Sequence, residues 1–191
     1  MKMIKTNQTL DAKNLACPMP IVKTKKMIGE LAPGQVLEIL ATDKGSTADL
    51  KAWADGTGHQ YLGTIEDAGV LKHYLRKASS DEEKPETNHP DVVQNEELAK
   101  KQEAGEKITV LDVREEAEYS FNHVPGSVSI PLGDLENRIS ELKKEDEIYI
   151  ICRTGKRSDF AAQKLAQNGF TKVWNVVPGI CEWTGPTEKN I

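Results

Sequence analysis

Three apolar runs in the second half of the chain limit most strongly the folds available to it. They span residues 107–113, 147–151 and 173–177, and stretches with helical periodicity lie between them. Runs that are apolar throughout, rather than at every second residue, are typical of parallel strands buried on both faces. The pattern predicts a parallel sheet covered by helices on both faces, with any ligand site beyond the carboxyl ends of its strands.

Shorter signals place the other elements of this half. Asn95 is of the residue type that caps helix N-termini, and Gly169 can close a helix in the left-handed conformation. The sequence predicts a strand near 128–130 and helices over 115–121, 134–142 and 158–168. Strands and helices therefore alternate, which is the order expected of an α/β domain.

The first half alternates in the same way on a smaller scale. Pro18 and Pro20 suit the first turn of a helix, and Ser46 is a candidate N-cap. Strands are expected near 4–11, over 36–41, near 60–65 and near 70–76, with helices after Pro18 and from Ser46 through Trp53. This order predicts a small two-layer α/β sandwich.

A polar segment separates the two halves. Residues 79–90 contain no apolar residue other than proline and carry several charges, which is typical of a linker. We therefore expect a domain over residues 1–78, a linker over 79–90 and a second domain over 91–191. Each domain is long enough to build a small core.

Composition argues against several classes of partner. The formal net charge is −5 and no block of Lys and Arg stands out, so direct nucleic-acid binding is not expected. The N-terminus, Met1-Lys2-Met3-Ile4-Lys5, lacks the apolar run of a signal peptide, and no stretch approaches the roughly 20 apolar residues of a membrane span. We expect a cytoplasmic protein that makes no membrane contact.

The three cysteines, Cys17, Cys152 and Cys181, are odd in number and far apart, so they do not form a disulfide framework. No Cys-x-x-Cys and no histidine pair stands at ligand spacing, so no metal site is expected. Cys181 lies in an apolar segment before Trp183 and is interpreted as a packed structural thiol. The scattered histidines are interpreted as surface or hydrogen-bonding residues: His59, His73, His89 and His123.

Cys152 ends an apolar run and precedes a cationic loop and a helix. The loop reads Arg153-Thr154-Gly155-Lys156-Arg157. Amide groups at such a turn can form a nest that holds an anion, and Gly155 permits the turn. A free thiol has a pKa of about 8.5, and a helix N-terminus with nearby cations lowers it to roughly 3.5–7.5. The five loop residues are therefore candidates to bind an anionic sulfur donor beside a Cys152 thiolate, and the alternative is a buried structural cysteine.

A series of motifs surrounds this loop. They are Leu111-Asp112-Val113-Arg114-Glu115, Glu118-Tyr119, His123-Val124-Pro125-Gly126-Ser127, Ile130-Pro131-Leu132, Cys152 through Ser158, and Pro178-Gly179-Ile180-Cys181-Glu182-Trp183. As a set they resemble the single-domain rhodaneses, which are sulfurtransferases. The resemblance implies a persulfide on Cys152, held by loop amides, with Asp112 and Arg114 as structural supports. Asn122 and Pro178 stand where the family usually has glycine, and these differences would change the shape of the rim of the Cys152 site.

The same fold also hosts phosphatases of the cell-cycle type. Their loop has one residue more between cysteine and arginine than the four that separate Cys152 from Arg157. A shorter loop makes a smaller cradle, which suits a sulfur atom better than a phosphoryl group. We therefore favour sulfur transfer over phosphate hydrolysis.

Cys17 also precedes a helix, and its dipole favours a thiolate there, but these residues alone leave a chance placement equally open. The surrounding motifs are Leu10-Asp11-Ala12, Leu15-Ala16-Cys17-Pro18-Met19-Pro20, Pro33-Gly34, Asp43-Lys44-Gly45-Ser46 and Gly58-His59. Over residues 8–77 they resemble the TusA/SirA type of sulfur carrier, with Cys-Pro-x-Pro as the most specific piece. The resemblance implies a persulfide on Cys17. Trp53 stands where some relatives have a second cysteine, so a disulfide within this domain is excluded.

The two resemblances imply a two-domain sulfurtransferase. Cys152 would take sulfane sulfur from thiosulfate or a low-molecular-weight persulfide and pass it to Cys17, to an external thiol or to a sulfur-carrier protein, through cysteine persulfides and without a cofactor. The alternative is a non-catalytic, persulfide-sensing adaptor whose N-terminal domain docks a partner in sulfur trafficking. A role in RNA thiolation would need a partner to contact the RNA, and the oligomeric state stays open.

Overall fold

The computed structural model describes residues 4–191, and the chain divides into two compact units. The first runs from Met1 to Thr87 and the second from Asn88 to Ile191. Part of the expectation about a leader rests on residues 1–3, which lie outside the described residues. Within residues 4–191, no helix combines the length and the apolar character that crossing a bilayer requires.

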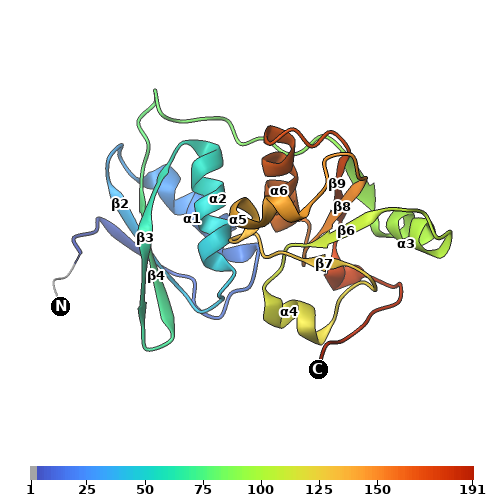
Figure 1. Ribbon diagram of the computed structural model, residues 1–191. Coiled ribbons are helices and arrows are strands. Elements are labelled where there is room, and N and C mark those ends of the chain that lie inside the picture. The colour runs from blue at the N-terminus through green and yellow to red at the C-terminus, as the bar shows by residue number, and fades with distance from the viewer. Residues whose placement is uncertain (1–3) are drawn as a thin grey trace. The chain divides into compact units, whose positions relative to one another are not determined.

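The first unit is a four-stranded sheet with two helices on one of its faces (Figure 1). The strand order is β1-β2-β4-β3, in which β1 and β2 are parallel and the other neighbours are antiparallel. The elements are β1 (Gln8–Asp11), α1 (Met19–Glu30), β2 (Val36–Ala41), α2 (Ser46–Thr57), β3 (Gln60–Asp67) and β4 (Val70–Arg76). The predicted two-layer α/β sandwich is confirmed.

One face of this sheet is apolar, which explains why both helices pack on it. In β2, Leu37, Ile39 and Ala41 are buried, and the residues between them are partly exposed. Alternate residues of a strand face opposite sides of the sheet, so these three share one face. The helices bury matching side chains: Ile21 and Ile28 from α1, and Leu50 and Trp53 from α2. Burying a side chain of this size contributes about 1.5–3 kcal/mol.

Ser46 does not cap α2, so that expectation was wrong. Gly45 occupies the N-cap position, and the Ser46 hydroxyl donates to the carbonyl of Asp43 over 2.6 Å. The same oxygen lies 2.9 Å from Nε2 of His73. Because a hydroxyl has one hydrogen, Ser46 accepts from His73. Ser46 therefore ties the turn before α2 to strand β4.

His73 is the centre of a buried polar cluster. Its ring is fully buried, and Nδ1 lies 2.8 Å from the Tyr61 hydroxyl and 2.9 Å from the Thr64 hydroxyl. Burial lowers the pKa of His73 to about 4, because the charged ring would lose its hydration. The remaining histidines also make hydrogen bonds to the backbone, as expected: His59, His89 and His123.

Acidification should therefore destabilise the first unit. The pKa of His73 falls from 6.5 to about 4 on folding, so the unfolded chain binds a proton that the folded chain does not. This stability is fully present above pH 6.5 and is lost as the pH falls toward 4, by up to about 3 kcal/mol. From pH 7 to pH 5, we expect the protection factors of the β4 amides, which correct for slower intrinsic exchange at lower pH, to fall about tenfold more in the wild type than in a His73→Gln chain, measured by mass spectrometry. The same pH dependence in both chains would contradict this.

The segment expected to be a linker is anchored near both of its ends. Glu82 pairs with Arg76 at 3.1 Å, and the amide of His89 donates to the carboxylate of Asp159 over 2.8 Å. The division between the two units falls after Thr87, inside this segment. Residues 79–90 are thus held by specific polar contacts, although their composition is that of a flexible tether.

The second unit is a five-stranded, fully parallel sheet in the order β5-β9-β8-β6-β7. Figure 1 shows α3 and α6 on opposite faces of it. The elements are β5 (Val92–Gln94), α3 (Asn95–Glu103), β6 (Thr109–Asp112), α4 (Glu116–Phe121), β7 (Val128–Ser129), α5 (Leu135–Arg138), the 3-10 turn η1 (Ile139–Glu141), β8 (Ile148–Ile151), α6 (Lys156–Gln167), β9 (Val173–Val177) and the 3-10 turn η2 (Ile180–Glu182). The predicted parallel sheet with helices on both faces is confirmed.

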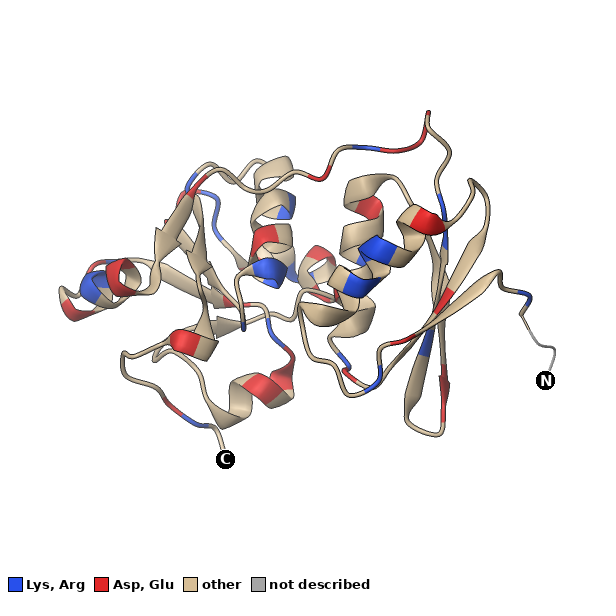
Figure 2. Cartoon of the chain, turned by 180° about the vertical axis from the view of Figure 1, so that it is seen from behind, with Lys and Arg blue, Asp and Glu red and all other residues tan. Residues whose placement is uncertain are grey.

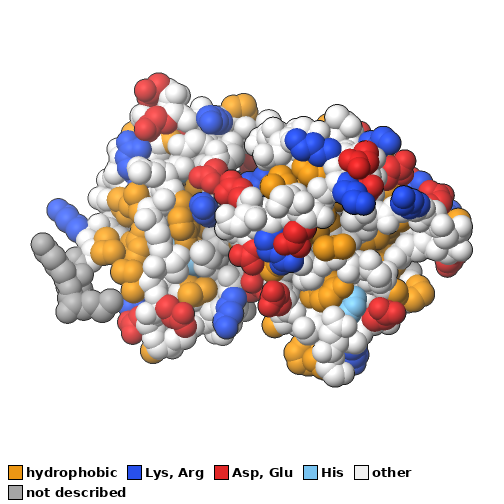
Figure 3. Space-filling model, in the orientation of Figure 1, with side chains coloured by type: hydrophobic (Ala, Val, Ile, Leu, Met, Phe, Trp, Pro, Cys, Tyr) orange, Lys and Arg blue, Asp and Glu red, His pale blue; other side chains and the backbone are white. Residues whose placement is uncertain are grey.

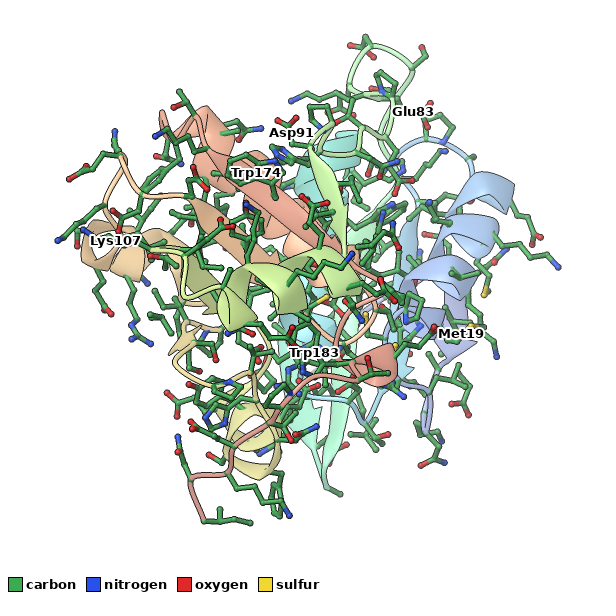
Figure 4. All side chains as sticks on the ribbon, turned by 90° about the vertical axis from the view of Figure 1, so that its right-hand side faces the viewer. Met19, Glu83, Asp91, Lys107, Trp174 and Trp183 are labelled. Atoms are coloured by element: carbon green, nitrogen blue, oxygen red, sulfur yellow. The ribbon has the colours of Figure 1, made fainter. Side chains whose placement is uncertain are left out.

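A cluster of apolar side chains fills the space between this sheet and α3. Tyr149 and Ile151 of β8 and Leu98 of α3 belong to it and are buried. Two partly buried tryptophans labelled in Figure 4, Trp174 and Trp183, pack against it. On the other face, α6 buries Phe160, Ala161, Ala162 and Leu165. β8 is therefore buried on both sides, which matches its unbroken apolar sequence.

Charges of both signs are mixed on the described surface. On the face shown in Figure 3, Lys and Arg alternate with Asp and Glu, and apolar patches lie between them. Helix α3 carries Glu96 and Glu97 in its first turn and Lys100 and Lys101 in its last turn. This arrangement opposes the helix dipole at each end, which stabilises the helix by about 0.3–1 kcal/mol per charge. Figure 2 shows that acidic and basic residues are likewise mixed along the rest of the chain.

Candidate functional site

Cys152 lies at the carboxyl end of β8, the central strand of the second sheet. It is fully buried, and three residues separate it from the start of α6 at Lys156. The carboxyl ends of parallel strands are where such sheets place their ligands. The fold thus sets the thiol where a loop and a helix N-terminus can act on it together.

Two hydrogen-bond donors face the sulfur of Cys152. The amide nitrogen of Gly155 lies 3.2 Å from Sγ, and the hydroxyl oxygen of Ser158 lies 3.3 Å from it. Gly155 has φ 86°, a left-handed conformation that turns the chain back toward the sulfur and is open to glycine without strain. Donors in this position stabilise negative charge on the sulfur, as a nucleophile or a leaving group requires.

The carbonyl groups of Cys152 and Arg153 are fixed by the segment that follows β9. Ile180 donates its amide to the first over 2.9 Å, and Cys181 donates to the second over 3.1 Å. In a trans peptide the C=O and the next N–H point in opposite directions, so the amides of Arg153 and Thr154 are turned away from this segment. The loop is therefore held with its carbonyls on one side and these amides on the other.

Asn95 fixes that segment in turn, instead of capping α3 as expected. Its side chain donates to the carbonyl of Gly179 over 2.9 Å and accepts from the same residue's amide over 3.2 Å. Gln94 occupies the N-cap position of α3. The expectation failed because Asn95 uses both polar atoms of its amide in a tertiary contact, which leaves the helix amides without them.

Arg157 is buried and forms a two-point ion pair with Glu118 of α4. Its Nη1 and Nη2 atoms lie 2.8 and 3.1 Å from the two carboxylate oxygens. Burial raises the pKa of Glu118, but the hydrogen bonds and charge of Arg157, the Glu115 amide and the charge of Arg114 together outweigh burial, and the pKa is lowered overall. Arg157 therefore joins α6 to α4, with its charge balanced by the carboxylate.

The other loop residues complete the turn around Cys152. Arg153 is exposed, Thr154 is partly buried, and Lys156 places Nζ 4.9 Å from the centre of the Phe160 ring. A cation over an aromatic face is attracted by the ring's negative face. The structure thus brings all five predicted loop residues together, and Arg153 and Lys156 are the other two cations of the loop.

A second buried ion pair lies at the end of the neighbouring strand β6. Arg114 binds the Asp112 carboxylate through Nε at 3.0 Å and Nη2 at 2.6 Å, and Nη2 also donates to the carbonyl of Asn122. Both charged side chains are almost fully buried. The pair fixes the chain on either side of α4, which is the supporting position that the resemblance implies.

Cys17 belongs to the first unit and stands two residues before α1. It is buried, whereas Met19 and Val22 in the first turn of α1 are exposed, and Figure 4 labels Met19 at the start of the helix. The turn before Cys17 is held by the amide of Asn14, which donates to the Thr42 hydroxyl over 2.9 Å. The predicted position of Cys17 at a helix N-terminus is therefore present in the fold.

Cys181 is exposed, so the interpretation as a packed thiol was wrong. Its sulfur lies 3.5 Å from the carbonyl of Pro178. The aromatic residue that suggested packing, Trp183, turns its own ring toward the apolar cluster without covering the cysteine. No disulfide joins the cysteines within residues 4–191.

Sequence reasoning gave no role to Ser158 or Asn175, which the structure places at the site. Ser158 is the last residue of the cysteine loop motif and is buried in the first turn of α6, next to Cys152. Asn175 is the single polar residue of the apolar strand β9, and it bonds to Ser158 and to Gly155. A lone amide inside a buried strand was the signal available, because such a group needs partners.

Family models match both units. The model described as sulfurtransferase TusA matches residues 8–77, and the model of the rhodanese-like domain matches residues 94–186. A solved structure, the rhodanese-like domain of the Anabaena protein Alr3790, is 29% identical over 53% of this chain and 80% of that one, with a TM-score of 0.49.

One of the relatives matches the chain over nearly its whole length, and another matches the first unit alone. YrkF of Bacillus subtilis strain 168, whose name describes it as a candidate sulfur carrier protein, is 53% identical over 97% of this chain and 100% of its own length. The sulfur carrier protein TusA of Allochromatium vinosum is 42% identical over 38% of this chain and 95% of its own. With motifs, fold and sequence in agreement along its length, the chain belongs to the sulfur-transfer family in which a TusA domain precedes a rhodanese-like domain.

Proposed function

We propose that the chain is a sulfurtransferase in which Cys152 receives sulfane sulfur and passes it on to Cys17 or to an external thiol. The observation that supports this most directly is the pair of donors at Cys152, the Gly155 amide and the Ser158 hydroxyl, both within 3.3 Å of the sulfur. They suit a sulfur atom that alternates between thiolate and persulfide. The donor class we propose is thiosulfate or a low-molecular-weight persulfide.

The loading step needs no group beyond the thiol. The Cys152 thiolate attacks the outer sulfur of thiosulfate, a new S–S bond forms, and the old S–S bond breaks with its electron pair on the departing sulfite. Arg153 and Lys156 supply positive charge for the dianion, while Arg157 holds α4 and α6 together through Glu118. Because loading and relay are both displacements at sulfur by a thiolate, we expect neither a metal nor an organic cofactor.

The relay step is the same kind of displacement at sulfur, with Cys152 now as the leaving group. The Cys17 thiolate attacks the outer sulfur of the Cys152 persulfide, and Cys152 leaves as a thiolate. The support for Cys17 as acceptor is its position before α1 and the match of residues 8–77 to the TusA model. A carrier domain of this kind is expected to deliver the persulfide sulfur to a further thiol or sulfur-carrier protein.

Mass spectrometry of persulfides tests the relay. We would incubate the full chain with thiosulfate, trap persulfides by alkylation, and examine the peptides that contain Cys17 and Cys152. Label is expected on both cysteines in the wild type, on neither in Cys152→Ser, and on Cys152 alone in Cys17→Ser. Cys181→Ser is the matched control, because this exposed thiol takes no part in the proposed route, and it should label like the wild type.

Two results would refute the relay. Label on Cys17 in the Cys152→Ser chain would show that the first domain is loaded independently. Label on Cys152 but never on Cys17 in the wild type would show that the second domain serves outside thiols only. An adaptor without catalysis would bind persulfides yet show no turnover with thiosulfate and an acceptor.

A further inference from the structure

The sulfur of Cys152 is one member of a closed ring of hydrogen bonds. The Ser158 hydroxyl lies 3.3 Å from Sγ and 2.6 Å from Oδ1 of Asn175. Nδ2 of Asn175 donates to the carbonyl of Gly155 over 3.1 Å, and the amide of Gly155 returns to Sγ over 3.2 Å. All four residues lie in the second unit, and Cys152, Ser158 and Asn175 are each at least nine-tenths buried.

The ring fixes the orientation of the Asn175 amide. The carbonyl of Gly155 can only accept a hydrogen bond, so the nitrogen of Asn175 must face it and the oxygen must face Ser158. Turning the amide around would set two oxygens against each other in a buried place. Asn175 therefore offers Ser158 a permanent acceptor.

Ser158 has one hydroxyl hydrogen and two neighbours that can accept it. While Sγ is neutral, as a thiol or inside a persulfide, the hydrogen goes to Oδ1 of Asn175, which is the closer atom and the better acceptor. When Sγ is a thiolate, a charge-assisted bond to sulfur is roughly twice as strong as a neutral one, and the hydrogen turns toward it. Oδ1 of Asn175 then loses its donor, which is unfavourable for a buried carbonyl.

We propose that Asn175 is a positioning residue that holds the Ser158 hydrogen while the Cys152 sulfur is neutral and releases it when that sulfur becomes a thiolate. The inference rests on the function proposed above, in which Cys152 alternates between these states. Asn175 acts on the sulfur only through Ser158. Releasing the hydrogen leaves Oδ1 of Asn175 without a donor. Asn175 therefore disfavours the thiolate and lowers the reactivity of Cys152 when it carries no persulfide.

The step most affected is the departure of sulfur from Cys152. An acceptor thiolate attacks the outer sulfur, a new S–S bond forms, and the bond from the outer sulfur to Sγ breaks with its electron pair on Sγ. The acceptor becomes a persulfide and Cys152 becomes a thiolate, so no outside oxidant or reductant is used. Ser158 then turns its hydrogen onto Sγ, which makes it a catalytic residue for this step.

The test follows Cys152 alone, in a full chain that also carries Cys17→Ser and Cys181→Ser. The readout is the pH at which alkylation by iodoacetamide reaches half of its maximal rate. Ser158→Ala removes a donor to the thiolate and is expected to raise this midpoint by about one pH unit. Asn175→Ala removes the competing acceptor and is expected to lower the midpoint by about half a unit when Ser158 is present. In the Ser158→Ala chain, Asn175→Ala is expected to change nothing.

A purely structural role predicts the opposite sign. If Asn175 only held the loop, its loss would move the donors away from Sγ and raise the midpoint, and that result would overturn the proposal. An equal shift with and without Ser158 would overturn it as well. Asn168→Ala is the matched control, because Asn168 follows helix α6 and donates to the carbonyl of Lys164, outside the ring. This substitution should leave the midpoint unchanged.

Asn175→Leu keeps the test decisive if the alanine variant does not fold. Leucine has nearly the shape of asparagine but no acceptor, so it should lower the midpoint when Ser158 is present and change nothing in the Ser158→Ala chain. Equal shifts in the two chains, or a rise when Ser158 is present, would overturn the proposal. The charged groups around the loop stay the same in all variants: Arg153, Lys156, Arg157, Glu118 and the Asp112–Arg114 pair. Alkylation needs no sulfur donor, so this outcome is independent of whether thiosulfate loads Cys152.

Discussion

A Cys152→Ser chain is expected to form thiocyanate from thiosulfate and cyanide at least about a thousandfold more slowly than the wild type. The reaction needs a sulfur that can attack as a thiolate, carry a second sulfur and leave again. A serine hydroxyl stays protonated at neutral pH and cannot form a persulfide. The Gly155 and Ser158 donors would remain in place, so the loss would isolate the nucleophile itself.

Cys17→Ser is the informative comparison for this assay. Cyanide is small and can accept sulfur from the Cys152 persulfide directly, so turnover should stay within about threefold of the wild type. Thiocyanate is measured by its coloured iron complex, with protein integrity checked by circular dichroism. If Cys152→Ser retained turnover and Cys17→Ser abolished it, sulfur would enter the chain at Cys17 and the proposed direction would be reversed.

Much of the second unit could be predicted because its central strands are apolar at most positions, rather than at every second one. Runs over 107–113, 147–151 and 173–177 indicated parallel strands buried on both faces, and β6, β8 and β9 are such strands. The short edge strand β5 was not predicted, because three residues carry no periodicity.

The cysteine loop was predictable for a different reason. Its residues are contiguous in sequence, so their chemistry is visible before any fold is known. The contacts that hold it come from far along the chain: Ser158 and Asn175 are 17 residues apart, and Asn95 and Gly179 are 84 residues apart. No local pattern encodes such pairs, because only the packing of α3, α6 and β9 on one sheet brings them together.

The two wrong helix caps show the same limit. Ser46 and Asn95 stand at helix starts and have the side chains that caps use. In the fold, Ser46 bonds to His73 and Asn95 bonds to Gly179, so tertiary hydrogen bonds replaced the local ones. Residue type located both helix starts within a residue or two, and the partners of each side chain required the three-dimensional structure.

Gly179→Ala is expected to lower the free energy of unfolding of the second unit by about 3 kcal/mol or more. An added Cβ would lie 2.4 Å from the carbonyl oxygen of Cys152 and 2.8 Å from that of Arg153. Both contacts are to backbone, so no side chain can rotate away to relieve them. The residue also has φ 88° and ψ −165°, a conformation that is essentially restricted to glycine.

The same substitution should reduce thiosulfate turnover by about a hundredfold in protein that remains folded. The Gly179 segment supplies the amides of Ile180 and Cys181 that fix the carbonyls of Cys152 and Arg153. Moving this segment by about 1 Å would rotate the loop peptides and misplace the nucleophile, and a shift of that size costs about 10²-fold in rate.

Gly105→Ala is the control for Gly179→Ala. It distinguishes the steric clash at position 179 from the effect of replacing any glycine that has a positive φ. Gly105 also has a positive φ, 66°, but nothing lies within 4 Å of the place that its Cβ would take. Its replacement should cost only about 1 kcal/mol and leave turnover unchanged. Urea unfolding and thiocyanate formation would be measured on both variants. If Gly179→Ala matched Gly105→Ala in both measurements, the close approach of Gly179 to the cysteine loop would not be what holds the site together. A loss of turnover at unchanged stability would instead show that the contact positions the loop without supporting the fold.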